Sequence, residues 1–285
     1  MVTETEGASM RDERPHRRLV YRHGVLIRVT HWINLVCMTI LLMSGLQIFN
    51  AHPALYWGDK SVFAAPILTM GEGKNAAGQP IGITQIFGHD FTTTGVLGLS
   101  RGEDGQMIER GFPEWATIPG PQWLAMGRTW HFFFAWIFVI NGAIYLAATI
   151  FGRHLRRDLV PSGAELRHIG RSIWDHLRLR FPKERRYNVL QKLSYLFVIF
   201  VLAPVIVATG LTMSPRIDAG YPFLLTLFGG RQSARTIHFI CAFSFLGFAA
   251  IHIAMVLVSG VWNNLRSMVT GRYAIREEDG SHGKE

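Results

Sequence analysis

Four long apolar stretches alternate with polar segments along the chain. The stretches are Val25–Phe49, Trp123–Phe151, Leu193–Met213 and Thr236–Val261. About 20 helical residues cross the roughly 30 Å hydrocarbon core of a bilayer, so each stretch is long enough to span it. The pattern predicts an all-α integral membrane protein whose four transmembrane helices form a bundle. Pro204, inside the third stretch, predicts a kink that neighbouring helices would accommodate.

The basic residues between the stretches predict how the chain is oriented. The segments 1–24, 152–192 and 262–285 hold 5, 11 and 4 Lys and Arg residues, whereas 50–122 and 214–235 hold 4 and 3. Lys and Arg collect in the cytoplasmic loops of membrane proteins. We therefore expect a multi-pass protein of the bacterial cytoplasmic (inner) membrane. Both of its termini would be cytoplasmic.

Two connecting segments are longer than a four-helix bundle requires. Residues 50–122 are rich in Gly, Pro and aromatic residues without a strong helical period, which favours an ordered periplasmic cap that could dock a partner. In the cytoplasmic loop, residues 162–181 place apolar side chains three and four apart among arginines, as in an amphipathic helix on a membrane surface. The expected organisation is a tail at 1–24, a membrane domain at 25–261 and a second tail at 262–285.

Composition agrees with a membrane location. Hydrophobic residues make up 49% of the chain and charged residues 17%, below the roughly 25% charged that is usual in soluble domains. The formal net charge of +9 would ordinarily suggest nucleic acid as a partner. Because the basic residues are concentrated between the apolar stretches, they fit a lipid surface better. We expect membrane lipid, and no nucleic acid, as a partner.

Four histidines lie within the predicted spans, and their depths pair them. His238 and His252 are fourteen positions apart on the fourth stretch, which is about 21 Å along a helix and nearly the same helix face. His31 lies near the cytoplasmic start of the first stretch, and His131 near the outer end of the second. Depth therefore pairs His31 with His252 at the inner level and His131 with His238 at the outer level.

Two stacked pairs of histidines in a four-helix bundle are the arrangement expected of two b-type haems. Each imidazole would supply one axial ligand, and bis-histidine ligation leaves no open coordination position, which favours electron transfer. Zinc or copper would require more ligands at each level. We therefore predict two haem b groups, one at each pair.

Other residues in or next to the spans agree with this prediction. Arg28, Arg128 and Arg235 each lie three residues before one of these histidines. They are suited to pair with haem propionates near a membrane surface, although ordinary interfacial placement of arginine would also explain them. Gly45, fourteen positions after His31, could leave space for the second macrocycle, or simply allow close helix packing.

Several motifs resemble the di-haem cytochrome b subunits that anchor respiratory formate dehydrogenases, nickel–iron hydrogenases and thiosulfate reductases. They are "RVTHW" at 28–32, "TWHFFFAW" at 129–136, "YNVLQK" at 187–192 and the His-x13-His spacing of the fourth stretch. The resemblance covers all four spans. It implies exchange of electrons with a membrane quinone, and it implies the same four haem ligands: His31, His131, His238 and His252.

The resemblance also implies a quinone site. In the formate dehydrogenase branch, a Tyr-Asn-x-x-Gln-Lys segment at the cytoplasmic start of the third helix helps to bind the quinone. This chain has Tyr187, Asn188, Gln191 and Lys192 in that pattern. Asn188 would donate a hydrogen bond to a quinone carbonyl. Without the resemblance, the segment is a polar helix start with Asn188 as a candidate N-cap.

The long 50–122 loop departs from the formate dehydrogenase and hydrogenase subunits. It is more similar to the thiosulfate-reductase-type cytochrome b proteins, which accompany periplasmic molybdopterin oxidoreductases. The resemblance therefore implies a periplasmic partner of molybdopterin or iron–sulfur type that docks on this loop. Electrons would pass between that partner and quinone through the outer and inner haems, in a direction that depends on the partner.

Two other functions are compatible with the sequence. The first is a stand-alone di-haem oxidoreductase that reacts with a small periplasmic species such as superoxide, and with quinone. The second is a haem-free membrane transporter or assembly factor whose histidines relay protons or bind a metal transiently. A reduced-minus-oxidised spectrum separates this second function from the haem hypothesis.

Overall fold

The structure is a computed structural model. It describes residues 17–152, 160–167, 169, 170, 172, 174, 178 and 189–276. The chain divides into two compact units. One unit is Thr30–His252, and the other combines Met1–Val29 with Ile253–Glu285.

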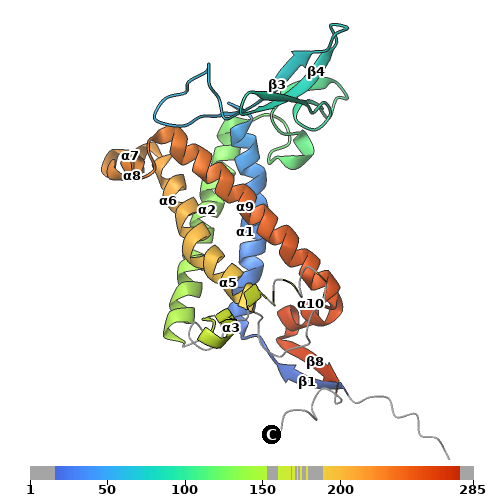
Figure 1. The fold of residues 1–285 in the computed structure, drawn as a ribbon, viewed down its shortest axis with the longest axis vertical. Coiled ribbons are helices and arrows are strands. Elements are labelled where there is room, and N and C mark those ends of the chain that lie inside the picture. The colour runs from blue at the N-terminus through green and yellow to red at the C-terminus, as the bar shows by residue number, and fades with distance from the viewer. Residues whose placement is uncertain are drawn as a thin grey trace, which may run out of the picture. The chain divides into compact units, whose positions relative to one another are not determined.

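Among the described residues, four helices are long and apolar enough to cross a membrane. They are Val25–Phe49 (α1), Leu124–Phe151 (α2), Val189–Thr212 (α5 to α6) and Arg231–Val258 (α9). Within the unit Thr30–His252, α1, α2 and α5 to α6 run along the long axis of the view, and α9 is inclined to them (Figure 1). Large apolar side chains such as Phe133, Trp136 and Ile140 remain exposed, as expected where lipid covers a helix. The four predicted spans are confirmed, and the chain is a mostly helical integral membrane protein.

The third span is interrupted where the sequence predicts a kink. It consists of α5 (Val189–Phe197), a π-helical turn η3 (Val198–Leu202) and α6 (Ala203–Thr212). Pro204 is the second residue of α6, two positions after the π turn ends. Because proline lacks an N–H and crowds the preceding carbonyls, a local π turn is one way for a membrane helix to accommodate it.

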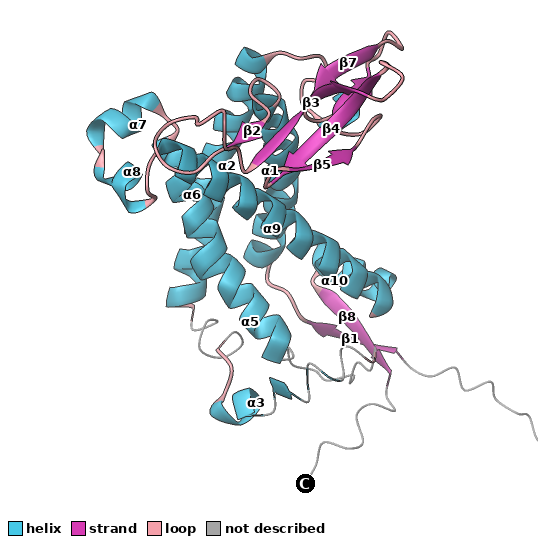
Figure 2. Ribbon diagram, turned by 45° about the horizontal axis from the view of Figure 1, so that its top comes forward, coloured by secondary structure: helices cyan, strands magenta, loops and turns pink. Residues whose placement is uncertain are grey.

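The regular secondary structure of residues 50–122, called the cap below, consists mainly of strands. The strands β2 (Ala54–Leu55), β3 (Leu68–Lys74), β4 (Pro80–Ile86) and β5 (His89–Thr92) form one antiparallel sheet in that order. A hairpin of β6 (Gly98–Arg101) and β7 (Met107–Arg110) and a 3₁₀ turn η1 (Glu114–Ala116) complete it (Figure 2). The segment is ordered and contains strands, so the all-α prediction is wrong for it, and its periplasmic location stays a prediction.

Local sequence explains the longest hairpin of the cap. The side-chain oxygen of Asn75 accepts hydrogen bonds from the backbone N–H groups of Ala77 and Gln79, and Gly78 has a positive φ of 77°. This is a turn closed by its asparagine. It pairs β3 with β4 in a register that runs from Leu68↔Ile86 to Lys74↔Pro80. The strands contain glycine rather than a regular alternation of β-branched residues, which hid them from a search for periodicity.

The cap has its own apolar core, which includes the end of α1. Phe49, Leu55, Leu68, Met70 and Phe112 are buried together there. The ring centroids of Phe49 and Phe112 lie 5.6 Å apart. Two short helices, α7 (Pro215–Gly220) and α8 (Phe223–Leu227), lie between α6 and α9.

The second unit joins the two ends of the chain. Strand β1 (Arg17–Tyr21) pairs antiparallel with β8 (Arg272–Arg276). Between α9 and β8 lies the helix α10 (Val261–Thr270), which starts after Gly260 with a φ of 102°. The sequence predicts tails at 1–24 and 262–285, and it does not reveal that their described parts form a common sheet.

The predicted amphipathic helix at 162–181 is described only in part. Its first turns form α3 (Gly163–Arg167), and residues 169, 170, 172 and 174 are also helical. Most of the rest lies outside the described residues.

Candidate functional site

The unit Thr30–His252 brings the four histidines of the spans together in two pairs. The imidazole centroids of His31 and His252 are 6.2 Å apart, with an angle of 60° between the rings. Those of His131 and His238 are also 6.2 Å apart, at 63°. We call them the inner and outer pairs, after their predicted depths. Three helices supply the rings, and α9 contributes one to each pair.

The spacing within each pair fits a metal atom between two imidazoles. A histidine nitrogen binds a transition metal at roughly 2 Å, and the ring centre lies about 1 Å behind the nitrogen, so two opposed rings would be separated by about 6 Å. One imidazole on each side is the donor set of bis-histidine haem, whose macrocycle supplies the other ligands. Among the described residues, no group of three or more His, Cys, Asp or Glu side chains is arranged to hold a metal ion.

The ring of His131 is held by two consecutive residues of α1. Ser44 Oγ lies 3.1 Å from His131 Nδ1, and the Ser44 hydroxyl donates to the carbonyl of Ile40 at 2.6 Å. Gly45 comes next, and a Cβ at Gly45 would lie 3.4 Å from Cε1 of His131. The sequence suggested that Gly45 leaves space for a macrocycle or packs closely against a helix. In the structure, the group beside Gly45 is the imidazole of His131.

The ring of His238 is held in the same way by α6. Thr209 Oγ1 lies 3.1 Å from His238 Nδ1, and its hydroxyl donates to the carbonyl of Val205 at 2.8 Å. His238 Nδ1 also lies 3.0 Å from the carbonyl oxygen of Ile206. Gly210 follows, and a Cβ there would lie 3.3 Å from the Cε1 of the ring. Sequence analysis missed Ser44, Thr209 and Gly210, although "SG" and "TG" inside two membrane spans were a visible signal.

Aromatic rings surround the inner pair. Phe248 stacks on His252 with centroids 6.1 Å apart and an angle of 17°, and Tyr195 of α5 meets Phe248 edge-on at 6.3 Å. Trp32 lies edge-on to His31 at 5.8 Å. Through Tyr195 and Phe248, helix α5 is therefore connected by packing to His252.

A buried asparagine fixes α1 beside the inner pair. The side-chain amide of Asn141, on α2, donates to the carbonyl of Thr30 at 2.9 Å and to Asn34 Oδ1 at 2.7 Å. Thr30 precedes His31. Hydrogen bonds of this kind join membrane helices where water is absent, so Asn141 sets the position of the helix that carries His31.

Hydrogen bonds from the first turns of α9 attach the outer end of this helix to the cap. Arg235 donates to the carbonyls of His52 and Ala54 at 2.6 and 2.8 Å. The Thr236 hydroxyl donates to the carbonyl of Tyr56 at 2.7 Å, and the backbone N–H of Gly58 donates to Ser233 Oγ at 2.7 Å. These bonds fix the helix immediately before His238. Sequence analysis missed this role of Arg235.

The other two arginines predicted to pair with haem propionates also contact protein groups. The guanidinium of Arg128 lies over the ring of Phe132, 5.7 Å from its centroid. In the unit that contains the chain ends, Arg28 Nη1 donates to the carbonyl of Val269. Pairing of Arg28, Arg128 or Arg235 with propionates stays a prediction.

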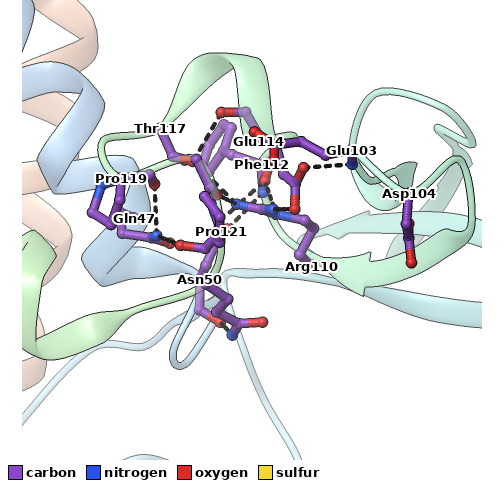
Figure 3. A network of polar contacts seen from close by, with 12 residues as sticks. Gln47, Asn50, Glu103, Asp104, Arg110, Phe112, Glu114, Thr117, Pro119 and Pro121 are labelled. Carbon is purple, nitrogen blue, oxygen red and sulfur yellow. Dashed lines mark hydrogen bonds and ion pairs between the residues drawn. The ribbon is translucent and has the colours of Figure 1, made fainter.

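A polar network joins the cap to α1 and to the chain that leads into α2 (Figure 3). The Gln47 amide donates to the carbonyls of Pro119 and Pro121 at 2.8 and 2.5 Å. Asn50 exchanges two hydrogen bonds with the backbone of Phe112, at 2.7 and 3.1 Å. Since Ser44 and His131 lie in the helices on either side of this network, it contributes to the position of the outer pair.

Only half of the predicted quinone segment is described. Tyr187 and Asn188 lie outside the described residues, and Gln191 and Lys192 lie in the first turn of α5. Lys192 is buried, and its Nζ forms an ion pair with Glu165 Oε1 at 2.8 Å. Glu165 was missed from sequence because the pair joins residues 27 positions apart.

Glu165 also caps its own helix, α3. Its carboxylate accepts the backbone N–H of Ser162 at 2.6 Å, and the Ser162 hydroxyl accepts the N–H of Glu165 at 3.3 Å. This reciprocal pair is a capping box. One carboxylate therefore fixes the start of α3 and attaches it to the start of α5.

The Glu165–Lys192 pair predicts a pH dependence. The hydrogen bond from Lys192 lowers the pKa of Glu165 from its usual 4.5 to about 2. A carboxyl whose pKa is lower in the folded protein stabilises that state above its unfolded pKa, and this contribution disappears as the pH falls through the folded value. We expect the α3–α5 attachment to weaken between about pH 4.5 and about pH 2, measured as hydrogen exchange of α3 amides. Glu165→Gln should remove this dependence, and a dependence that persists in the variant would contradict it.

The chain is similar to known membrane proteins over most of its length. A family model described as prokaryotic cytochrome b561 matches residues 22–271. A protein of Azospira oryzae named "Putative protein-methionine-sulfoxide reductase subunit YedZ1" is 29% identical over 251 residues, which is 87% of this chain and 96% of the relative. No solved structure gave a significant match.

Proposed function

Since the chain belongs to the prokaryotic cytochrome b561 family, we propose that it is a membrane electron-transfer subunit with two haem b groups in stacked bis-histidine sites. The observation that carries this proposal is the pair of equal spacings, 6.2 Å between the ring centroids at both levels of the bundle. Family membership agrees with the resemblance to cytochrome b subunits seen in the sequence. It does not distinguish the thiosulfate-reductase branch, which stays a prediction.

The protein residues would hold the two groups from opposite sides. His31 and His252 are the proposed ligands of the inner haem, and His131 and His238 those of the outer haem. Haem b bound at such a site supplies a one-electron redox couple. Because α9 carries one ligand of each site, the fourteen residues between His238 and His252 fix the step between the sites at about 21 Å along the helix.

A periplasmic oxidoreductase is the proposed partner at the outer site. The cap is ordered, contacts the first turns of α9 and presents exposed aromatic side chains such as Trp57, Phe63 and Trp115. The Azospira relative is named as a putative subunit of a protein-methionine-sulfoxide reductase, which favours a reductase as the partner, and the resemblance of the sequence implies that it is of molybdopterin or iron–sulfur type. With a reductase, electrons would leave the membrane at the cap, whereas a dehydrogenase would deliver them there.

Quinone is the proposed reactant at the inner site. Gln191 and Lys192 begin α5, and Tyr195 one turn later reaches His252 through Phe248. This packing supports a quinone position near Asn188 and Gln191. Asn188 would donate to a quinone carbonyl, and Lys192, held by Glu165, would keep a positive charge beside it.

The proposed cofactor content is directly measurable. Purified protein is expected to contain two haem b per chain by haem extraction, and to show a b-type band in its reduced-minus-oxidised spectrum. One haem per chain would contradict the second site. A chain without haem would favour the haem-free transporter, and quinone-linked turnover of superoxide by the isolated subunit would favour the stand-alone oxidoreductase.

A further inference from the structure

The two outer imidazoles are held by the same two-residue device, although they lie on different helices. In each case a hydroxyl residue meets Nδ1 at 3.1 Å and a glycine follows it against Cε1. We call Ser44–Gly45 and Thr209–Gly210 the hydroxyl–glycine clamps. The glycines allow each ring to approach the neighbouring helix closely enough for its Nδ1 to reach the hydroxyl oxygen.

The hydrogen-bond donors in the clamps can be assigned from chemistry. A hydroxyl group has one proton. The proton of Ser44 is directed to the carbonyl of Ile40 at 2.6 Å, and that of Thr209 to the carbonyl of Val205 at 2.8 Å. Both oxygens are therefore acceptors toward the rings, so Nδ1 of His131 and of His238 carries the proton. Nε2 is then the unprotonated nitrogen of each ring and can bind iron.

The inner imidazoles are held differently. Among the hydrogen bonds between described residues, none joins Nδ1 of His31 or His252 to a hydroxyl or a carbonyl. The neighbours of these rings are aromatic, with Phe248 stacked on His252 and Trp32 edge-on to His31. The two levels of the bundle thus differ in the atoms that contact the ligands rather than in the ligands themselves.

We propose that the hydroxyl–glycine clamps lower the reduction potential of the outer haem. A hydrogen bond accepted from Nδ1–H makes the imidazole a stronger donor to the metal and stabilises the oxidised iron. Ser44 and Thr209 are then positioning residues that tune the outer site. This inference rests on the proposed function, because it requires haem at the outer pair.

Redox titration of variants tests the clamps. Ser44→Ala and Thr209→Val each remove one acceptor; Thr209→Val keeps the volume of the buried side chain and leaves the Ile206 carbonyl 3.0 Å from His238 Nδ1. Each should raise the outer midpoint potential. The double variant should shift the outer reduction equilibrium about tenfold, which is about 59 mV for a one-electron couple. The inner potential should not change, and titration in a His252→Ala background isolates the outer haem.

Matched variants separate tuning from damage to the fold. Thr209→Ser keeps the hydroxyl and should keep the wild-type potential. Ser44→Cys offers a weaker acceptor and should give an outer midpoint potential between those of the wild type and Ser44→Ala. This variant keeps the test usable if Ser44→Ala loses haem. Thr212 is buried and donates to the carbonyl of Thr209 without touching a histidine. Thr212→Val should therefore leave both potentials unchanged.

The haem content of the same samples distinguishes the two possible failures. A wild-type protein with fewer than two haems would overturn the proposed function. Two haems in every variant, with an unchanged or lowered outer potential in the double variant, would overturn the clamp proposal and leave the function intact. The clamp proposal would also be overturned if Thr212→Val shifted the outer midpoint potential as much as the double variant does.

Discussion

Membranes that contain the His252→Ala variant are expected to hold half the haem of the unaltered protein and to lose quinone turnover. His252 faces His31 at 6.2 Å, so its loss leaves the inner site with one ligand. The outer site keeps both of its rings and both hydroxyl–glycine clamps. Its b-type band should persist with an unchanged midpoint potential. Haem extraction, redox titration and quinol oxidation on the same membranes measure all three outcomes.

The other histidine of α9 offers a variant that matches His252→Ala. His238→Ala should remove the outer haem and keep the inner one, so the two variants should lose different components of the redox titration. His89→Ala, at an exposed position in the cap, should lose neither. If His252→Ala and His238→Ala removed the same component, the pairing would be wrong. If either removed both haems from a folded protein, the two sites would not be independent.

The two pairs could be predicted from sequence because helix geometry is a local property. Rise and turn per residue place His238 and His252 on one face at two depths, and the charge of the loops gives the depths of His31 and His131. The clamps could not be predicted in this way. Ser44 and His131 are 87 positions apart, and which hydroxyl meets which ring depends on how two helices pack against each other.

The cap shows a different limit of sequence reasoning. Its order was predictable from its aromatic residues and its length, but its strands were not. In β3, glycines at positions 71 and 73 stand where a strand usually has a side chain. Gly71 lies beside the carboxylate of Glu109 on β7, and a Cβ there would be 3.0 Å from that oxygen. Close approach between strands explains the glycines, and it depends on contacts that the sequence does not reveal.

The two pairs lie among different kinds of groups. The outer pair contacts hydroxyls and, at His238, a backbone carbonyl, whereas the inner pair contacts aromatic rings, to which α5 adds Tyr195 through Phe248. A polar protein surface suits a docked partner, and an aromatic wall suits a flat, apolar quinone ring. The difference between the ends supports the proposed assignment of partner to cap and quinone to α5.

A buried cation holds the cap together. Arg110 is 2% exposed, and it donates to the carbonyls of Phe112 and Gly120 at 2.7 and 3.0 Å (Figure 3). It also forms an ion pair with Glu114 at 3.2 Å. Burial lowers the pKa of Arg110 and the Glu114 carboxylate raises it, but a guanidinium stays charged in proteins.

Arg110→Ala is expected to unfold the cap locally while the inner haem persists. Removing one partner of a buried ion pair costs about 3–5 kcal/mol, because the Glu114 carboxylate and two carbonyls lose their donor. Chymotrypsin should cleave the cap of this variant much faster in spheroplasts, and the inner b-type component should remain in the same sample. Arg101→Ala, at an exposed position at the end of β6, is the control, and equal cleavage of the two variants would contradict the prediction. The double variant Arg110→Ala and Glu114→Ala should recover part of the resistance of the cap to chymotrypsin, since no unpaired carboxylate is then left behind.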